Sequence, residues 1–149
     1  MSLDDWYKNG WLKKHQTSRE EIGNLIAIIE RDLADCSNEH VSQDWRFAIV
    51  YNAARQCCLV ALYCSGYRTG RGAGDHYYVI QSLTQTMGTD LTETRDYLDS
   101  CRIKRNISDY DKAGVISHHE VEELISATKD LFEKVKIWGR YHHPDYFPQ

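Results

Sequence analysis

No proline precedes Pro144, so the body of the chain can form long helices without interruption. Apolar residues recur at helical spacing in five segments, at about 18–36, 42–65, 75–87, 90–111 and 117–139. Ser18 with Glu21 and Ser117 with Glu120 fit the capping-box pattern at two of the starts. No strand-like alternation competes, and short connections favour antiparallel neighbours. We therefore predict an all-α, up-and-down bundle of four to five helices, with a short extra helix within residues 1–14.

The size and composition of the chain indicate one soluble domain. Its 149 residues suit a single core, expected at about 17–139 and followed by an irregular aromatic tail at 140–149. No apolar run approaches 18 residues, so no membrane span is expected, and residues 1–6 do not resemble a secretory signal. The five cysteines form no C-x-x-C pair and lie within apolar helical patterns. These features predict a reduced protein with a cytoplasmic location.

A charged residue ends the apolar row of the segment 90–111. Leu98, Cys101 and Arg105 fall at i, i+3 and i+7, on one helical face. The guanidinium cannot lose its proton, so it needs an acceptor, a partner surface or a ligand. Asp109 lies one turn after Arg105, and Tyr110 lies one turn after Asn106. Either a salt-bridged helix end or a ligand site fits this cluster.

Two other regions carry polar groups that need partners. Asn52 and Arg55 interrupt the apolar or small faces of the segment 42–65, and these groups must be satisfied inside the bundle or across an interface. A homodimer is therefore predicted, burying well over roughly 1,000 Å² in total. Arg68 and Arg71 lie in a glycine-rich stretch just before His76, where a helix start could hold an anion. A solvated loop and a packing histidine are the alternatives there.

Several chemistries are excluded by missing patterns. No Glu-x-x-His occurs, and the paired histidines 118–119 and 142–143 do not suit a metal site. No G-x-S-x-G or G-x-G-x-x-G motif is present. We predict neither a metal nor an organic cofactor. The net charge of −4 argues against a broad surface for nucleic acid, so any phosphate contact must use a local patch.

One combination of residues resembles the HEPN superfamily, and within it the bacterial stand-alone HEPN proteins. The matching features occur in order across four helical segments, namely 51–54 (YNAA), 62–68 (LYCSGYR), His76, and Arg105-Asn106 ahead of Tyr110. The resemblance covers about residues 17–139. It implies a helical bundle that forms a two-fold dimer. It also implies kinship with metal-independent endoribonucleases, many of them toxins in toxin–antitoxin, phage-defence or RNA-processing systems.

The resemblance further implies an active motif of an arginine, a polar residue and a histidine, facing its copy across the dimer. Arg105 and Asn106 match the first two positions. Tyr110 stands where the shortest spacing would place the histidine. The usual pKa of tyrosine is about 10 and that of histidine about 6.5, so tyrosine is a poor proton-transfer group at neutral pH. Binding without efficient cleavage is therefore expected.

We accordingly predict a dimeric, cytoplasmic, HEPN-like protein that binds RNA or a nucleotide in an interfacial groove, with weak or no ribonuclease activity. Arg105, Asn106 and Tyr110 would form the degenerate catalytic motif. Five further residues are expected to contribute to binding, namely Arg68, Arg71, His76, Arg102 and Asp109. The alternatives are an active endoribonuclease toxin and a protein-interaction partner of a nucleotidyltransferase or an antitoxin.

Overall fold

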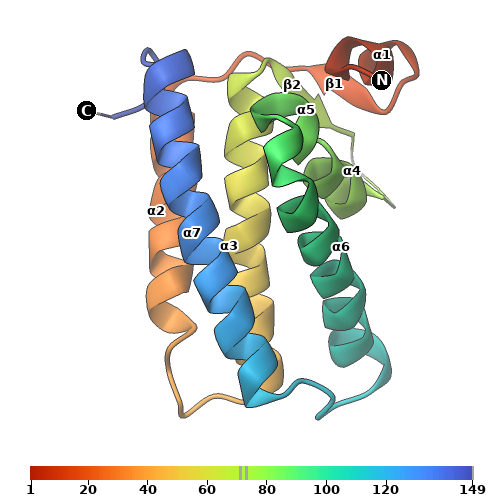
Figure 1. Cartoon of the computed structure of the whole chain (residues 1–149), viewed down its shortest axis with the longest axis vertical. Coiled ribbons are helices and arrows are strands. Elements are labelled where there is room, and N and C mark those ends of the chain that lie inside the picture. Colours follow the sequence, from red (N-terminus) through yellow and green to blue (C-terminus); the bar gives the residue numbers. More distant parts are fainter. Residues whose placement is uncertain (71, 73, 149) are drawn as a thin grey trace.

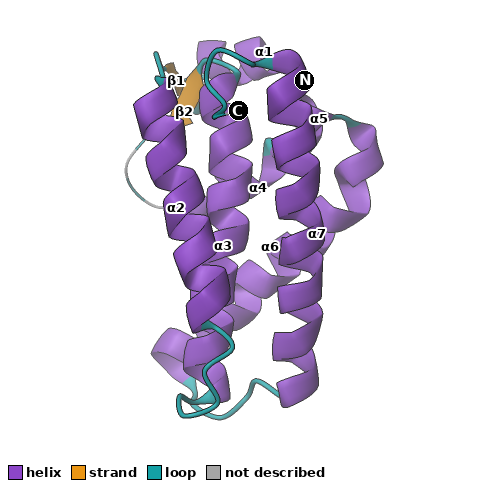
Figure 2. Cartoon of the chain, turned by 90° about the vertical axis from the view of Figure 1, so that its left-hand side faces the viewer, coloured by secondary structure: helices purple, strands orange, loops and turns teal. Residues whose placement is uncertain are grey.

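Four long helices alternate in direction along the chain (Figure 1). In the computed structural model, which describes residues 1–70, 72 and 74–148, they are α2 (Arg19–Asp35), α3 (Gln43–Cys64), α6 (Thr92–Asn106) and α7 (His118–His142). α3 contacts the other three, and α2 and α6 lie on opposite sides of it. Figure 2 shows α2, α3 and α7 side by side along the long axis. The all-α class predicted from the sequence is confirmed.

Side-chain caps start the helices close to where the sequence placed them. Ser117 accepts a hydrogen bond from the Glu120 N–H, and the Glu120 carboxylate accepts one from the Ser117 N–H, which completes the predicted capping box. Ser18 caps α2 through the Glu21 N–H. The Glu21 carboxylate does not close the second box, because it accepts hydrogen bonds from Thr17 and His15 instead.

The segment 75–87, predicted as one helix, is two. α4 (Asp75–Gln81) and α5 (Leu83–Met87) are separated at Ser82, which is fully buried. The Ser82 hydroxyl donates to the Val79 carbonyl at 2.7 Å, a local bond that competes with the helical ladder. A 3₁₀ turn, η1 (Thr89–Leu91), then leads into α6.

The end of the predicted helix 90–111 also differs from a regular helix. α6 ends at Asn106 and continues as a π-helical turn, η2 (Ile107–Asp111). The Lys112 N–H donates to the Ile107 carbonyl at 2.9 Å, an i→i+5 bond. This wider turn carries Asp109 and Tyr110 and sets where their side chains lie. Such π turns recur at functional sites.

A small antiparallel sheet was not predicted. After the expected N-terminal helix α1 (Leu3–Lys8), the strand β1 (Leu12–Lys14) pairs with β2 (Tyr67–Thr69), with Leu12 opposite Thr69. Three-residue strands are too short to show an alternating pattern, which is why the sequence gave no signal. Trp6, Leu12 and Leu62 pack together beneath this sheet. The sheet fixes the backbone around Arg68, which the sequence had suggested lay in a loop.

The main core lies around α3 and contains all five cysteines as buried free thiols, as predicted. Burial raises the pKa of each thiol, which keeps it protonated and unreactive. Trp45 of α3 is 66% exposed, because it lies in the first turn of the helix at the end of the bundle (Figure 1).

The C-terminal tail contributes to the core more than expected. α7 extends to His142, and Phe147 is only 1% exposed within the main core. The Phe147 ring occupies the space where a β-carbon of Gly139 would lie. Arg19 donates to the carbonyls of Pro144 and Asp145, each at 3.2 Å. The tail is therefore held at the same end of the bundle as α1 (Figures 1 and 2).

α3 has the length and composition of a membrane-spanning helix, with a mean hydropathy of 1.3 over its most apolar window. However, 72% of that window is buried against the rest of the chain. The central helix of a soluble bundle has the same properties. The fold is therefore compatible with a soluble protein.

Candidate functional site

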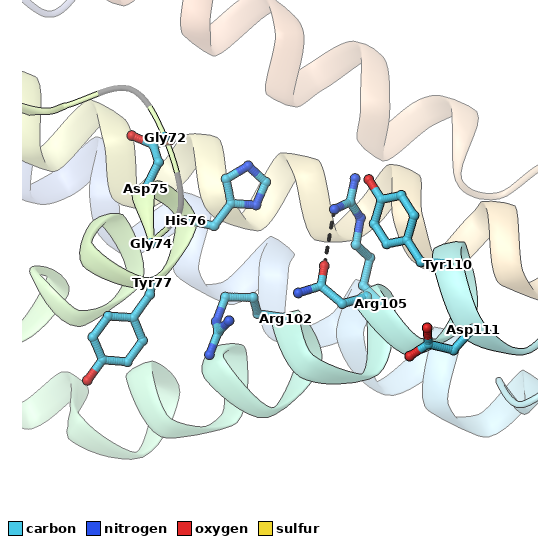
Figure 3. Close-up of a pocket in the computed structure, with 10 residues that line it drawn as sticks. Gly72, Gly74, Asp75, His76, Tyr77, Arg102, Arg105, Tyr110 and Asp111 are labelled. Carbon is cyan, nitrogen blue, oxygen red and sulfur yellow. Dashed lines mark hydrogen bonds between the residues drawn. The ribbon is translucent and has the colours of Figure 1, made fainter.

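A cleft of about 540 Å³ opens between α4 and α6 (Figure 3). Its walls come from the start of α4, the last turns of α6, and η2. We call it the Arg105 cleft, and it is lined by Gly72, Gly74, Asp75, His76, Tyr77, Arg102, Arg105, Asn106, Tyr110 and Asp111. Pockets of this size hold small organic ligands.

The cleft brings together most of the site residues predicted from the sequence. All three motif residues line it, as do two of the predicted binding residues, Arg102 and His76. Figure 3 shows His76 on one side, and Arg105 and Tyr110 on the other. Arg68 lies in a neighbouring cleft, Asp109 faces a different hollow beside Tyr110, and Arg71 lies outside the described residues.

Arg105 is held by groups on its own helix. Its Nε lies 2.9 Å from an oxygen of Asp109, one turn on, although the N–H is not aimed well enough for a hydrogen bond. Its Nη1 donates to the Asn106 side chain at 3.4 Å (Figure 3). The guanidinium also lies 5.7 Å from the centre of the Tyr51 ring. The helix end therefore contains the Arg105–Asp109 ion pair that the sequence allowed. Arg105 nevertheless lines the cleft.

Arg102 is arranged in a similar way. Its Nε donates to Asp99 at 2.9 Å, and its guanidinium lies 5.4 Å from the centre of the Tyr77 ring. Each guanidinium of the Arg105 cleft thus has an aspartate partner three or four residues away. The side chains of both pairs are 22–25% exposed. Ion pairs that reach solvent contribute little stability, about 0–1 kcal/mol, so an incoming anion can compete with the aspartate.

His76 is neutral in this environment. Burial, helped by the nearby guanidiniums of Arg55, Arg105 and Arg102, lowers its pKa to about 4. Its Nδ1 lies 3.3 Å from the hydroxyl of Tyr51, whose own pKa is raised by burial. Because the phenol keeps its proton, it can donate to Nδ1, and this favours the tautomer with the imidazole proton on Nε2.

Tyr110 is the most open residue of the motif, with 76% of its surface exposed. No sequence pattern indicated Tyr77, Asp75 or the two glycines, Gly72 and Gly74, as site residues. Tyr77 directly follows His76, so the start of a helix after a glycine-rich stretch was the available signal for it. Asp111 lines the cleft because of the π turn η2, which no local sequence pattern predicted.

A second cleft of about 560 Å³ lies on the other side of His76. It shares Gly72, Asp75 and His76 with the first, so the two are neighbours. We call it the Arg55 cleft, and its remaining walls come from α3 and β2, namely Arg55, Leu59, Tyr63, Arg68, Thr69 and Gly70.

Asn52 and Arg55 of α3 both find partners within the chain, although the Arg55 Nε is buried without a hydrogen-bond partner in the part of the chain that the structure describes. Arg55 donates to the Asn52 side chain at 3.1 Å, and Asn52 donates to Asp32 of α2 at 2.7 Å. Asp32 is 5% exposed and also accepts a bond from Arg31. Asn52 therefore needs no second subunit to be satisfied. The homodimer stays a prediction, and this part of its rationale is removed.

The start of α4 is capped by a glycine rather than by a side chain. Gly74, at φ 92°, is the N-cap, and Asp75 is the first helical residue rather than the cap. The Asp75 carboxylate accepts a hydrogen bond from the Thr69 hydroxyl, which ties α4 to β2. α4 has only seven residues, so its end contributes little to anion binding. The basic character of this region therefore comes from side chains.

Together these features define a class of protein: an α-helical bundle with an arginine-rich double cleft on one side. Comparison with family models, with curated proteins and with solved structures gives no significant match. Within the described part of the chain, no three His, Cys, Asp or Glu side chains gather as a metal site. The functional interpretation therefore depends on the cleft residues themselves.

Proposed function

We propose that the chain binds RNA or a nucleotide in the Arg105 cleft. The observation that carries the proposal is the gathering of two guanidiniums, an amide, a neutral imidazole and two tyrosines around one cavity of ligand size. Guanidiniums bind phosphate with paired hydrogen bonds, and tyrosine rings stack on bases. The net charge of −4 makes such a local cluster of arginines more distinctive.

We also propose that the protein is a HEPN-like homodimer. Four large apolar side chains, which we call the Trp45 patch, are exposed at the start of α3, the end of α6 and in η2, namely Trp45, Ile103, Ile107 and Tyr110. Trp45 and Tyr110 line one hollow of about 390 Å³, and Tyr110 also lines the Arg105 cleft. A second copy covering this patch about a two-fold axis would bring the two Arg105 clefts towards each other.

The dimer is tested by sedimentation at micromolar concentration. We expect a dimer for the natural chain and a monomer for Trp45→Glu, because a charge in the centre of an apolar interface is costly. Tyr141→Glu is the matched control, since Tyr141 is 81% exposed on α7, outside the patch. A monomeric natural chain would remove both the dimer and the shared groove.

Binding is tested with a labelled single-stranded RNA. Arg105→Ala should weaken binding about tenfold or more, because hydrogen bonds to a charged group contribute about 1.5–3 kcal/mol. Arg140→Ala removes the same charge from an exposed position that lines neither cleft, and it should leave affinity unchanged. Equal loss from both variants would mean that the cleft has no special role. If no RNA or nucleotide binds the natural chain, the interaction-partner alternative takes over, with the Trp45 patch as its surface.

Cleavage of the RNA is expected to be weak or absent. Tyr110 replaces the histidine of the resemblance, and the pKa of about 4 makes His76 a weak base at neutral pH. A second candidate function, an active endoribonuclease, is favoured by one observation: His76 of α4 lines the same cleft as Arg105. In place of the missing histidine, Nδ1 of the neutral ring would accept a proton from a ribose hydroxyl after releasing its hydrogen bond from Tyr51.

Two substitutions separate these candidates. Tyr110→His should raise the cleavage rate about 10²–10⁴-fold by restoring a proton-transfer group near neutral pH. Adding Arg105→Ala should abolish that gain, because no guanidinium would remain to stabilise the developing phosphate charge. Strong cleavage by the natural chain that disappears in His76→Gln would establish the second candidate. Loss in Tyr110→Phe would instead assign proton transfer to the tyrosine.

A further inference from the structure

We propose that the Arg55 cleft is a second phosphate subsite, and that the ligand is an RNA strand crossing His76 from one cleft to the other. This inference rests on the proposed function and deepens it, because it selects an oligonucleotide over a single nucleotide. Arg55 from α3 and Arg68 from β2 would contact a phosphate beyond the one held at Arg105.

The placement of the clefts supports a continuous ligand. They are nearly equal in volume, about 540 and 560 Å³, and His76, Asp75 and Gly72 form walls of both. Each is large enough for a nucleotide-sized group. The Arg55 cleft also offers Leu59 and the Tyr63 ring as apolar surface for a base. A strand bound on both sides of His76 would therefore find similar components in each half.

The charges of the two clefts differ in a way that points to a ligand. Arg102 and Arg105 each have an aspartate partner. Across the described residues, Arg55 and Arg68 have no carboxylate within ion-pair distance, and Arg55 meets only the neutral Asn52 side chain. Among the described residues that line this cleft, Asp75 is the one carboxylate, and it accepts a hydrogen bond from the Thr69 hydroxyl. Two guanidiniums in one concave site therefore have no direct ion-pair partner among the described residues, and a phosphate can supply one.

Both arginines are placed by rigid elements rather than by a loose loop. The Asp32–Asn52–Arg55 chain of hydrogen bonds, 2.7 and 3.1 Å long, orients the Arg55 guanidinium from a buried carboxylate on α2. Arg68 lies opposite Lys13 in the small sheet, and Thr69 connects the same strand to α4. Sites on such elements lose less entropy on binding than sites on free side chains.

The test compares a short and a long ligand on the same full-length chain. The probes are AMP, which fills one cleft, and a single-stranded RNA of about six nucleotides, which can span both. Arg68→Ala should weaken RNA binding about tenfold. It should also reduce the slope of log K against log salt by about 0.7, the value for one phosphate on a single strand. AMP binding should not change.

Three further variants complete the design. Arg55→Gln should repeat the Arg68→Ala pattern while keeping a donor for Asn52, and Asn52→Ala, which releases Arg55, should weaken RNA binding but not AMP binding. Arg105→Ala should weaken both ligands, and Arg140→Ala should weaken neither. Unfolding curves confirm that each variant is folded, and Arg68→Ala, on a surface strand, is the variant least tied to the core.

The outcomes distinguish the two proposals. If Arg105→Ala weakens both ligands while Arg68→Ala and Arg55→Gln leave RNA affinity and salt slope unchanged, the second subsite is wrong and the proposed function stands. If AMP affinity falls as much as RNA affinity in Arg68→Ala, the two clefts are one mononucleotide site and the strand path is wrong. If neither ligand binds the natural chain, the proposed function and the subsite fail together.

Discussion

The two sides of α3 are built for different purposes. Towards α2 and α7 the helix is closely packed, and Phe147 fills the space beside Gly139. Towards α4 and α6 the same helix places the buried Tyr51 against His76 and presents Arg55, four residues on, to the Arg55 cleft. One side gains stability from tight contact, and the other leaves charged groups partly exposed with weak partners. The packed side thus acts as the rigid support for the open side.

This comparison leads to a separation of effects. Changes of volume on the packed side should alter the free energy of unfolding and leave ligand affinity alone, because the core tolerates no extra atoms. Changes of charge on the cleft side should alter affinity and pH dependence, with little effect on stability. The predictions below test that separation, beginning with the largest effect.

Gly139→Ala should give the largest loss of stability. A β-carbon at this position would clash with the Phe147 ring, which must then leave its buried site. Overpacking of a core costs about 1–3 kcal/mol, and sometimes more. Gly23→Ala is the matched control, since a β-carbon in the middle of α2 would contact nothing within 4 Å. It should stabilise the chain by about 0.5–1 kcal/mol. Urea unfolding measures both, and equal stability of Gly139→Ala and the natural chain would mean that Phe147 is not packed there.

The sequence predicted the packed side better than the open side. Long periodic segments and the serine caps at positions 18, 42 and 117 determine α2, α3 and α7, because these signals are local. The break between α4 and α5 at Ser82 depends on a hydrogen bond from its buried hydroxyl to the Val79 carbonyl. The burial of Phe147 depends on the absence of a side chain at Gly139, eight residues earlier in the chain. Such choices depend on tertiary packing, which periodicity does not describe.

The sequence predicted most residues of the candidate site but not how they are arranged in space. Arg105 was predicted because it is a charged residue on an apolar helical face. Asn106 and Tyr110 were predicted from the family resemblance. Sequence spacing could not show that His76, on another helix, lies in the same cleft. Nor could it show that Asn52 is satisfied by Asp32. Contacts between helices depend on how the elements pack, so spacing along one helix cannot predict them.

His76 should make the open side sensitive to acid. Its pKa in the folded chain is about 4, below the usual value of about 6.5, so the unfolded chain binds more protons between these pH values. Stability should therefore fall as pH is lowered from about 6.5 to 4. The expected loss is on the order of 1 kcal/mol, reduced by the partial exposure of the ring. His76→Gln should remove this component.

The measurement is urea unfolding at pH 7 and pH 5 for each variant. His119→Gln is the control, because His119 is an exposed histidine on α7 that lines neither cleft. It should keep the pH dependence of the natural chain. If His76→Gln and His119→Gln behave alike, the imidazole is not held neutral by its surroundings, and the electrostatic difference between the two sides of α3 is smaller than described.

Asp109→Asn should give the smallest change in stability. It tests whether Asp109 competes with a phosphate for the Arg105 guanidinium. The Asp109–Arg105 contact is an i,i+4 pair with both side chains 25% exposed, so its loss should cost less than about 1 kcal/mol. AMP affinity should rise about two- to fivefold, because the phosphate no longer competes with a carboxylate for the guanidinium. Asp130→Asn breaks an equivalent pair with Lys134 on α7 and should not change affinity. Titration of AMP measures both, and a lower affinity in Asp109→Asn would mean that Asp109 orients Arg105 for the ligand instead of competing with it.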